Sequence, residues 1–595
     1  MISYSSSIPA SATTGGSLLV LSIVLPIAGA LLAFVTGGRQ GERIVLATMP
    51  LGLATAIAIV VAMTRSRAPL VYLLGGWTPP LGITLRADGL STVMIVITAA
   101  VICSIGVFAR PEFCTPAGSV EARAPFAFWI LLSAIWAALN TVFLGGDLFT
   151  LYVALELLTF AAVPLVCLDG RGETLQAALR YLLFALLGSG LYLVGVALLY
   201  GVYGTLDIVL LSNRAAIGAA TLVAAALMTV GLLAKTALFP LYLWLPPAHA
   251  GAPTPASAVL SGLVVKGSFF IVVRLWFNVM PGLPGFMAAQ LLAGLGAAAI
   301  LFGSILALRQ ERLKLLIAYS TMAQVGYLFL MFPLAYDPAE AQLRSGGALT
   351  AGILQAISHA TAKSAMFLAA GLIYTALGHD RISGLAGIGR ALPISILTFA
   401  LGGVALVGVP PSGASLAKEL LLQAAAETGQ WWWAAVIQIG GIFTSGYLVL
   451  VLANALAFAE QPVTPRVPVR RIQEAAALAL ALCSLLLGLF PWEIYLSLPV
   501  GSASNSLALR ALSKVLWPIL GGAVLAIVIG RWGHRPVRGP FGTILVAMVG
   551  SARRPALIFG KMIELVDCLL QQWSVATLSL LVVAIIFGVA MLAGR

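Results

Sequence analysis

Six basic side chains lie inside otherwise apolar stretches of this 595-residue chain, and four of them are lysines. A lysine at the centre of a bilayer costs roughly 2.5–3.5 kcal/mol, so four cost on the order of 10 kcal/mol or more. A lysine can release its proton, whereas an arginine stays charged at every accessible pH. Together with Glu156 and His359, the lysines predict a path for protons or small cations across a membrane. The six basic residues are Lys235, Lys266, Lys363, Lys418, Arg180 and Arg274.

Glu156 and Lys235 are expected to form an ion pair. Glu156 lies nine residues after Asp147 in GGDLFTLYVALELL, which places it roughly 13 Å along its helix. A charged carboxylate is costly at that depth unless it is paired. Lys235 is the expected partner, because its own span is interrupted at Pro240. A pair that opens and closes would control proton transfer, and the alternative is a permanent pair that only joins two helices.

The remaining candidates extend this pair into a chain of proton sites. Lys266 follows the uncharged run TPASAVLSGLVV and is expected to receive a proton from Lys235. His359 and Lys363 are four residues apart in ISHATAKSAMF, so they share one face of a helix. A histidine is a natural link in such a chain, although a buried histidine that only satisfies its polar neighbours is the alternative. Lys418 is expected to be the group on the exit side.

Three further side chains are candidates for modulating roles, and a fourth is expected to lie apart. Arg180 begins the sixth expected span and could tune its neighbours. His249 lies in PPAHAGAPTP, a loop expected to reenter the membrane, where a role in proton entry is open. Glu419 follows Lys418 directly and points about 100° away on a helix, so the two should not form one ion pair. Arg274 is expected near a helix end, with its guanidinium reaching the membrane surface.

The elements that must position these residues are membrane-spanning helices. The chain is 61% hydrophobic and 9% charged, with a mean hydropathy of +1.05, whereas soluble proteins have about 25% charged residues. Long apolar runs recur, and few are shorter than the ~20 residues that span the hydrocarbon core. We therefore expect an all-α polytopic membrane protein without strands. It should have about sixteen spans, including one near residue 401 and one near residue 522.

The distribution of charge predicts the orientation of these spans. The net charge is +13, with 33 lysine and arginine residues. If the N-terminus is outside, most of them fall in loops on the cytoplasmic side, which is the positive-inside pattern. The pattern predicts an inner-membrane protein with both termini outside, and it assigns the basic charge to topology rather than to nucleic-acid binding. The N-terminus has no basic residue before the first apolar run, so that span should be retained.

Two proline-rich interruptions suggest an internal repeat. One follows Lys235 at Pro240, and the other, at residues 408–413, precedes Lys418. Proline breaks a helix, and irregular backbone is tolerated in a membrane only where protein or a wet cavity surrounds it. Two such interruptions predict inverted five-helix repeats, and ordinary kinks in a helical bundle are the alternative. The expected parts are an N-terminal three-helix segment (1–123), a first repeat (124–280), a second repeat (281–460) and C-terminal helices (461–595).

The C-terminal part contains an amphipathic segment. Between Pro555 and Trp573, apolar residues recur every three or four positions, while Lys561, Glu564 and Asp567 carry charge. This periodicity predicts a helix that lies along the membrane interface, followed by a final anchoring span. The helix could brace neighbouring subunits, and a simple linker is the alternative.

The sequence gives no sign of covalent chemistry or of a cofactor. The five cysteines form no C-x-x-C pair and do not group with histidine, so we expect neither a metal site nor a haem. The usual nucleotide-binding and hydrolase motifs are also missing. A redox enzyme that binds quinone and an inert scaffold are the alternatives from other classes of protein.

Six stretches carry a resemblance to a known family. The chain resembles the antiporter-like membrane subunits of respiratory complex I (L, M and N types), the A and D subunits of Mrp cation/proton antiporters, and the membrane subunits of energy-converting hydrogenases and formate hydrogenlyase. The stretches are GGWTPPLGITLRADGLS (75–91), GGDLFTLYVALELL (145–158), AKTALFPLYLWLPPAHAGAPTPASAVLSGLVVKGSFF (234–270), RLKLLIAYSTMAQVGY (312–327), SHATAKSAMF (358–367) and GVPPSGASLAKELL (408–421).

The resemblance assigns a role to each candidate residue. It implies that Glu156 is the glutamate of the fifth helix and that Lys235 is the lysine of the broken seventh helix. It matches Lys266 to the lysine of the eighth helix and Lys418 to that of the twelfth. His359 and Lys363 correspond to the link between two half-channels. Two positions depart from the family pattern: Pro247 stands where many relatives have an acidic residue, and Arg180 stands where lysine is common.

The resemblance also implies a function and partners. The expected protein is a proton-translocating subunit of a redox-driven complex, bound to other membrane subunits within the lipid bilayer. A subunit of an Mrp-type sodium/proton antiporter without a redox partner is the alternative. The expected transported ion is the proton, and sodium is the alternative that the sequence leaves open.

Overall fold

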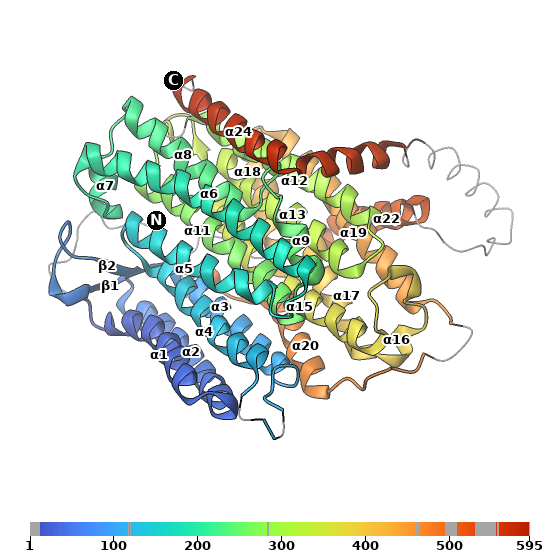
Figure 1. The fold of residues 1–595 in the computed structure, drawn as a ribbon. Coiled ribbons are helices and arrows are strands. Elements are labelled where there is room, and N and C mark those ends of the chain that lie inside the picture. The colour runs from blue at the N-terminus through green and yellow to red at the C-terminus, as the bar shows by residue number, and fades with distance from the viewer. Residues whose placement is uncertain are drawn as a thin grey trace.

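The computed structural model places most of the chain in one bundle of helices (Figure 1). The structure describes residues 12–116, 118–119, 121–282, 285–459, 463–493, 509–529, 555 and 558–593.

The N-terminal part is a group of long helices and one β-hairpin. The first two helices are antiparallel neighbours, and the first also packs against the fourth. Asp88 caps the third helix by accepting a hydrogen bond from the backbone N–H of Ser91. The elements are α1 (Ser17–Thr36), α2 (Gly38–Ser66), β1 (Leu70–Leu73), the 3₁₀ turn η1 (Leu74–Gly76), β2 (Thr84–Ala87) and α3 (Gly89–Ala109).

The expectation that the chain has no strands was wrong. Strands β1 and β2 pair antiparallel in the loop that joins α2 to α3. A second, shorter hairpin joins β3 (Tyr336–Asp337) to β4 (Gln342–Leu343). Both hairpins lie between spans, where backbone groups need partners that the helices cannot supply.

The first half of the bundle contains a broken helix and two π-helical segments. Residues 237–244 interrupt the helix that carries Lys235. The elements are α4 (Arg123–Leu144), α5 (Leu148–Val166), α6 (Gly172–Tyr203), α7 (Ile208–Arg214), α8 (Ala219–Thr236), α9 (Leu245–Gly251), α10 (Thr254–Val259), η2 (Leu260–Val264), α11 (Val265–Arg274) and η3 (Leu275–Val279).

The second half contains the other interruption, at residues 408–412, just before the helix that carries Lys418. Its elements are α12 (Phe286–Arg309), α13 (Leu313–Phe329), α14 (Met331–Leu334), β3, β4, α15 (Gly347–Leu377), η4 (Ile382–Gly384), α16 (Ile388–Ala391), α17 (Pro393–Val407), α18 (Gly413–Glu427) and α19 (Trp431–Leu456).

The C-terminal part covers the outside of the bundle. Helix α24 packs against α8 and α12, and Figure 1 shows it running along the outer side of the molecule. The elements are α20 (Arg471–Leu486), η5 (Leu487–Leu489), α22 (Leu509–Ile529), helical residues 558–570 and α24 (Trp573–Ala593).

Within the described residues, fourteen helices are long and apolar enough to cross a membrane. This is a polytopic helical membrane protein. The two expected spans near residues 401 and 522 fall on shorter apolar helices, Pro393–Val407 and Val515–Val528. The count of sixteen spans therefore stays a prediction.

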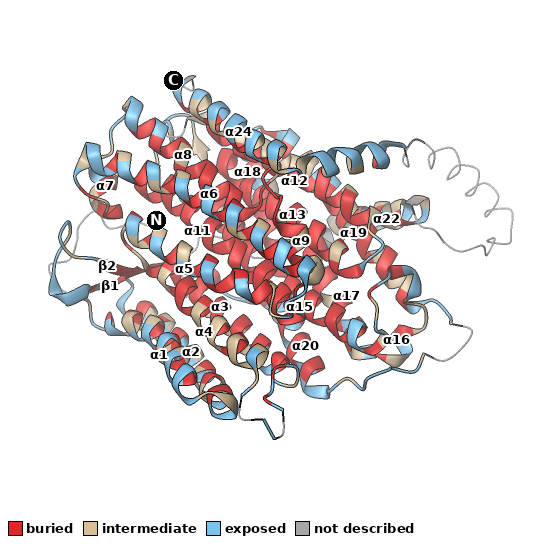
Figure 2. Cartoon of the chain, in the orientation of Figure 1, coloured by how far each residue is buried: buried red, intermediate tan, exposed pale blue. Residues whose placement is uncertain are grey.

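The helices that carry the central lysines are among the most deeply buried ones. The span Thr254–Val279, which carries Lys266, is 100% buried over its apolar window, and Gly347–Leu377, which carries Lys363, is 83% buried, whereas the first and last spans are each only 28% buried. Figure 2 shows this gradient, with buried residues concentrated around α13 and α15. The lysines of these helices are therefore surrounded by protein rather than by lipid.

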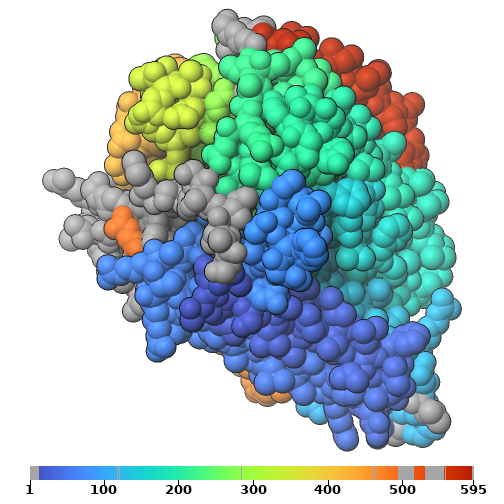
Figure 3. All heavy atoms as spheres, turned by 90° about the vertical axis from the view of Figure 1, so that its left-hand side faces the viewer, coloured from blue at the N-terminus to red at the C-terminus, as the bar shows by residue number. Residues whose placement is uncertain are grey.

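The loops gather at two ends of the bundle. At one end the loop before α5 hydrogen-bonds to β2 and to the start of α7, through Gly146 N to Thr84 O (3.0 Å) and Ile208 N to Gly146 O (2.9 Å). Figure 3 faces this end, where the blue N-terminal elements lie beside green residues near α7. At the other end Leu313 N donates to Asp380 O (2.7 Å). Loops that follow even-numbered spans therefore meet at one end of the bundle, and loops that follow odd-numbered spans meet at the other end. This is the arrangement expected of helices that cross a membrane in alternating directions.

The polar face of helix 558–570 turns toward the bundle. Asp567 accepts hydrogen bonds from the hydroxyls of Tyr242 (2.7 Å) and Tyr319 (2.8 Å), and Glu564 pairs with Arg309 (2.8 Å). The apolar side chains point outward; Ile558, Phe559, Met562, Leu565, Val566 and Leu569 are all exposed. The helix is therefore attached to the bundle through its charges, and Tyr242 ties it to the interruption between α8 and α9.

Candidate functional site

The structure brings Glu156 and Lys235 together between α5 and α8. Lys235 lies in the last turn of α8, and its Nζ is 3.3 Å from the Oε1 of Glu156. The ammonium group also donates to the Thr159 hydroxyl (2.8 Å) and to Leu155 O (3.3 Å). Both charged side chains are largely buried, with 6% and 13% of their surface exposed. Lys235 therefore has neutral partners that can hold its ammonium group if Glu156 moves away.

Lys266 is the next buried lysine along the chain. It is fully buried in α11, and its Nζ donates to the carbonyl of Ser261 in the π-helical segment η2. A π-helix leaves backbone carbonyls less regularly bonded than an α-helix does. Between the two lysines, the hydroxyl of Thr236 donates to that of Ser268 (2.9 Å) and joins the end of α8 to α11.

His359 and Lys363 lie on the same buried face of α15. The Nζ of Lys363 donates to the Ser320 hydroxyl and to Ile317 O (3.3 Å), both on α13. His359 is fully buried, and neither of its ring nitrogens has a hydrogen-bond partner in the protein. Helix α15 packs against η2, the π-helical segment that lies just before Lys266 in the chain. These three residues form the central cluster of the site.

Close backbone packing holds this cluster together. A Cβ added at Gly262 would lie 2.1 Å from the Ser364 hydroxyl and 3.1 Å from Ala360 O. Only glycine therefore lets η2 approach α15 so closely. The hydroxyl of Ser364 in turn donates to Ala258 O (3.1 Å), which fixes α10 against α15.

Lys418 occupies the second interruption. Helix α17 ends at Val407 and is capped by Gly408, whose φ of +95° is the left-handed conformation that glycine adopts without strain. The Nζ of Lys418 donates to the last carbonyls of α17, Leu406 O (3.0 Å) and Val407 O (2.8 Å). A cation is favourable at a helix C-terminus, where carbonyls carry partial negative charge. Lys418 and Glu419 both line a small cavity of about 60 Å³.

The four lysines follow one structural rule. Each ammonium group donates to at least one backbone carbonyl, and for Lys266 and Lys418 that carbonyl belongs to a π-helical segment or a helix end. Unsatisfied carbonyls and buried ammonium groups are each costly in a membrane, and pairing them reduces both costs. At Lys266 and Lys418, the irregular helix segments therefore help to solvate the charge.

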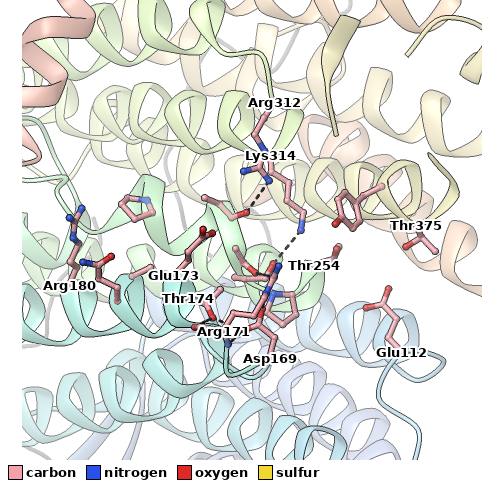
Figure 4. Close-up of a pocket in the computed structure, with 18 residues that line it drawn as sticks. Glu112, Asp169, Arg171, Glu173, Thr174, Arg180, Thr254, Arg312, Lys314 and Thr375 are labelled. Atoms are coloured by element: carbon pink, nitrogen blue, oxygen red, sulfur yellow. Dashed lines mark hydrogen bonds and ion pairs between the residues drawn. The ribbon is translucent and has the colours of Figure 1, made fainter. Parts of the chain in front are cut away.

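A polar cavity of about 570 Å³ opens at the end of the bundle where α5, α12 and α15 turn. Figure 4 shows its walls, with Arg180 at one side, Glu112 at the other and Lys314 between them. Glu112 is exposed to solvent there, yet the protein around its carboxyl group raises the pKa to about 7, an effect that Lys314 opposes.

His249 lies just inside this cavity. Its neighbours Pro247 and Ala250 line the cavity wall, while His249 itself is fully buried and both ring nitrogens lack protein partners. Its ring stacks on Phe367 at 4.8 Å, one turn along α15 from Lys363. The structure thus places His249 between the cavity and the central cluster.

Arg274 does not reach the membrane surface, and the expectation that it would was wrong. Its guanidinium is buried and donates two hydrogen bonds of 2.6 Å to the carboxylate of Asp88, with a third to the Ser91 hydroxyl (2.7 Å). Burial alone would raise the pKa of Asp88, but Arg274 outweighs that effect and lowers it to about 2. This pair joins α11 to the start of α3. Local sequence could not reveal it, because the partners are 186 residues apart.

Replacing Arg274 with alanine is expected to destabilise the protein by about 3–5 kcal/mol, because the carboxylate of Asp88 stays buried without its partner. Since the pKa of Asp88 lies near 2, the pair stabilises fully above pH 4 and is lost only as the pH falls toward 2. The measurement is the thermal unfolding of the solubilised protein. Arg123, exposed at the start of α4, supplies the control Arg123→Ala; an equal shift in both variants would contradict the prediction.

Across the described parts of the chain, no three His, Cys, Asp or Glu side chains lie together in a way that could hold a metal ion. The site that the structure does assemble consists of titratable side chains: one ion pair, a central cluster and a lysine at a helix end. The fold and this site define a polytopic membrane protein with a buried basic axis.

Comparisons with known proteins give the family. Residues 145–444 match the model of the family described as NADH:quinone oxidoreductase/Mrp antiporter, transmembrane. The chain is 32% identical over 459 residues to the N subunit of the NADH-quinone oxidoreductase of Desulforudis audaxviator, covering 74% of this chain and 88% of that one. It is 28% identical over 433 residues to the D subunit of the Na(+)/H(+) antiporter of Alkalihalophilus pseudofirmus, covering 72% and 84%. The chain belongs to the NADH:quinone oxidoreductase/Mrp antiporter membrane family.

Solved structures agree with this assignment. A chain of the Mrp complex from Dietzia sp. DQ12-45-1b superposes with a TM-score of 0.71 at 25% identity, covering 85% of this chain and 99% of that one. A chain of the membrane-bound sulfane sulfur reductase, an archaeal respiratory membrane complex, gives a TM-score of 0.70 at 25% identity, with coverage of 86% and 99%.

Proposed function

We propose that this chain translocates protons along its buried axis as a subunit of a larger membrane complex. A proton passes from Lys235 to Lys266, then to His359 and Lys363, and leaves through Lys418. The observation that carries the proposal is the set of four buried lysines, each held by backbone carbonyls inside the helical bundle. Burying a lysine in a membrane costs free energy, and a protein that served only as a scaffold would gain nothing from four of them.

The Glu156–Lys235 pair acts as the gate. When the pair is closed, the carboxylate favours the proton on Lys235. When Glu156 withdraws, Thr159 and Leu155 O still hold the amine, but the charge is no longer compensated and the proton moves on. Arg180 and Glu419 modulate this path, since Arg180 lines the entrance cavity and Glu419 lines the small cavity beside Lys418.

The 570 Å³ cavity is the cytoplasmic entrance to the path, and His249, which lies behind its wall on the side of the central cluster, modulates the transfer. This orientation follows from the positive-inside pattern and places both termini outside in an inner membrane. The interruptions at 237–244 and 408–412 mark corresponding places in two inverted repeats, 124–280 and 281–460. Residues 1–123 and 461–595 flank them.

An external source of energy has to drive the transfer, because each proton moved against 100 mV costs about 2.3 kcal/mol. The relatives of this chain include a subunit of NADH-quinone oxidoreductase and chains of respiratory and antiporter complexes. We assign this chain to a redox-driven complex built with other membrane subunits. Sodium/proton exchange in an Mrp-type complex is the second candidate, favoured by the likeness to the Mrp complex.

The complete complex, reconstituted in lipid vesicles, is expected to acidify one compartment when its driving reaction starts, at the same rate with and without sodium. The reason is that the axis offers amines and imidazoles, which exchange protons, rather than the oxygen ligands that hold small cations. The measurement is a pH-sensitive dye inside the vesicles. A rate that depends on sodium, without any driving reaction, would favour the exchanger instead.

A further inference from the structure

Two buried amides lie between the central cluster and Lys418, and the proposed path does not yet use them. Gln355 is on α15 and Gln324 is on α13, and both are fully buried. The Nε2 of Gln355 donates to the Oε1 of Gln324 at 3.0 Å. The Nε2 of Gln324 donates onward to the hydroxyls of Thr444 (3.1 Å) and Tyr447 (3.4 Å) on α19.

One end of this amide pair faces His359. Gln355 precedes His359 by four residues, so the two side chains share one face of α15. The Oε1 of Gln355 and both ring nitrogens of His359 are buried and lack protein partners. Buried polar groups nearly always have a partner, and ordered water supplies it where protein does not. Three unsatisfied atoms on neighbouring turns therefore point to water between them.

The other end of the pair leads to Lys418. Gln324 precedes Tyr327 by three residues, so these side chains also lie on one face of their helix. The Nζ of Lys418 lies 5.0 Å from the centre of the Tyr327 ring. The hydroxyl of Tyr327 donates to Ile437 O (3.3 Å) on the same helix as Thr444. Gln324 thus stands between the cluster on α15 and the lysine on α18.

We infer that Gln324 and Gln355 position the ordered water that links His359 to Lys418. The amides themselves neither gain nor lose a proton, so the water carries it. The Oε1 of Gln355 accepts a hydrogen bond from the water beside His359, and Gln324 fixes the orientation of Gln355. The two residues are positioning residues for the proposed transfer, and the inference rests on that proposed function.

The test is Gln355→Met in the complete complex, reconstituted in vesicles. Methionine has nearly the same length but cannot accept this hydrogen bond, so proton transport should fall at least tenfold while the complex still assembles. Gln355→Glu keeps the acceptor oxygens and should restore most of the transport. If Gln355→Met does not assemble, Gln324→Met serves instead, because it removes the acceptor that orients Gln355.

The matched control is Gln290→Met. Gln290 donates to Gln430 at 2.6 Å, so this variant breaks a second amide pair, which is only partly buried and lies off the proposed path. It should transport protons at the normal rate. A normal rate in Gln355→Met, or a loss that Gln355→Glu does not restore, would overturn the inference.

Lys363→Ala, measured in parallel, separates this inference from the proposed function. If Lys363→Ala stops transport and Gln355→Met does not, only the role of the amides is wrong. If both variants transport protons normally, the proposed function itself fails.

Discussion

Replacing Lys235 with alanine should abolish proton transport by the complete complex while leaving its assembly intact. The amine at this position is the first buried lysine on the path, and its ion pair with Glu156 at 3.3 Å is the gate. Glu156→Gln should have the same effect, since a neutral amide cannot stabilise the proton on Lys235 and then release it. We expect transport to fall at least tenfold in both variants, measured with a pH-sensitive dye in vesicles.

The control for these variants is Lys561→Ala. Lys561 is exposed on helix 558–570, so its loss changes the charge of the chain without touching the axis. A transport rate near the wild-type value in Lys561→Ala would show that the effect depends on position. Normal transport in either Lys235→Ala or Glu156→Gln would refute the gate.

Replacing Lys418 with arginine should also reduce transport at least tenfold, although the positive charge is kept. Arginine can still donate to the carbonyls of Leu406 and Val407, and the neighbouring 60 Å³ cavity gives room for the larger head group. It cannot release its proton at accessible pH. The variant should therefore assemble, with the end of α17 still capped, and fail only as a proton relay.

This variant separates two roles for a buried lysine. A purely structural cap predicts that Lys418→Arg transports normally and that Lys418→Met is unstable. A relay predicts that both variants lose transport. The measurement is transport per assembled complex, with assembly followed by the amount of intact complex after solubilisation.

The sequence could predict that these charged residues are buried because helical geometry connects spacing to depth. Glu156 was placed inside its helix by a rise of 1.5 Å per residue, and Lys235 was singled out by the proline that follows it. His359 and Lys363 share a helix face because they are four residues apart. Each of these predictions uses residues that are close together in the sequence. In the structure Glu156, Lys235, His359 and Lys363 are all largely or fully buried, as predicted.

Other features depend on contacts between distant segments, which local spacing does not encode. Asp88 and Arg274 are 186 residues apart, so their pair was missed. Hydropathy predicted that helix 558–570 is amphipathic but not that its charges, through Asp567, would contact Tyr242 and Tyr319. The hairpin of β1 and β2 was missed because hydropathy describes spans and says little about the loops between them.

Gln355 shows a further limit of prediction from the sequence. An uncharged amide in an apolar run has no distinctive pattern, and its importance depends on the hydrogen bond to Gln324 on another helix. Acceptors left unsatisfied in a buried region are visible only once the packing is known. Sequence reasoning therefore finds the charged groups of such a path more readily than the neutral groups between them.

The most direct test of the central claim uses the Lys235→Ala complex in vesicles. It measures the rate of proton transport and the rate of the driving reaction in the same sample. If protons move along this buried axis, the variant should build up less than about a tenth of the wild-type pH gradient at equal amounts of assembled complex. A full gradient formed without an amine at position 235 would contradict the account.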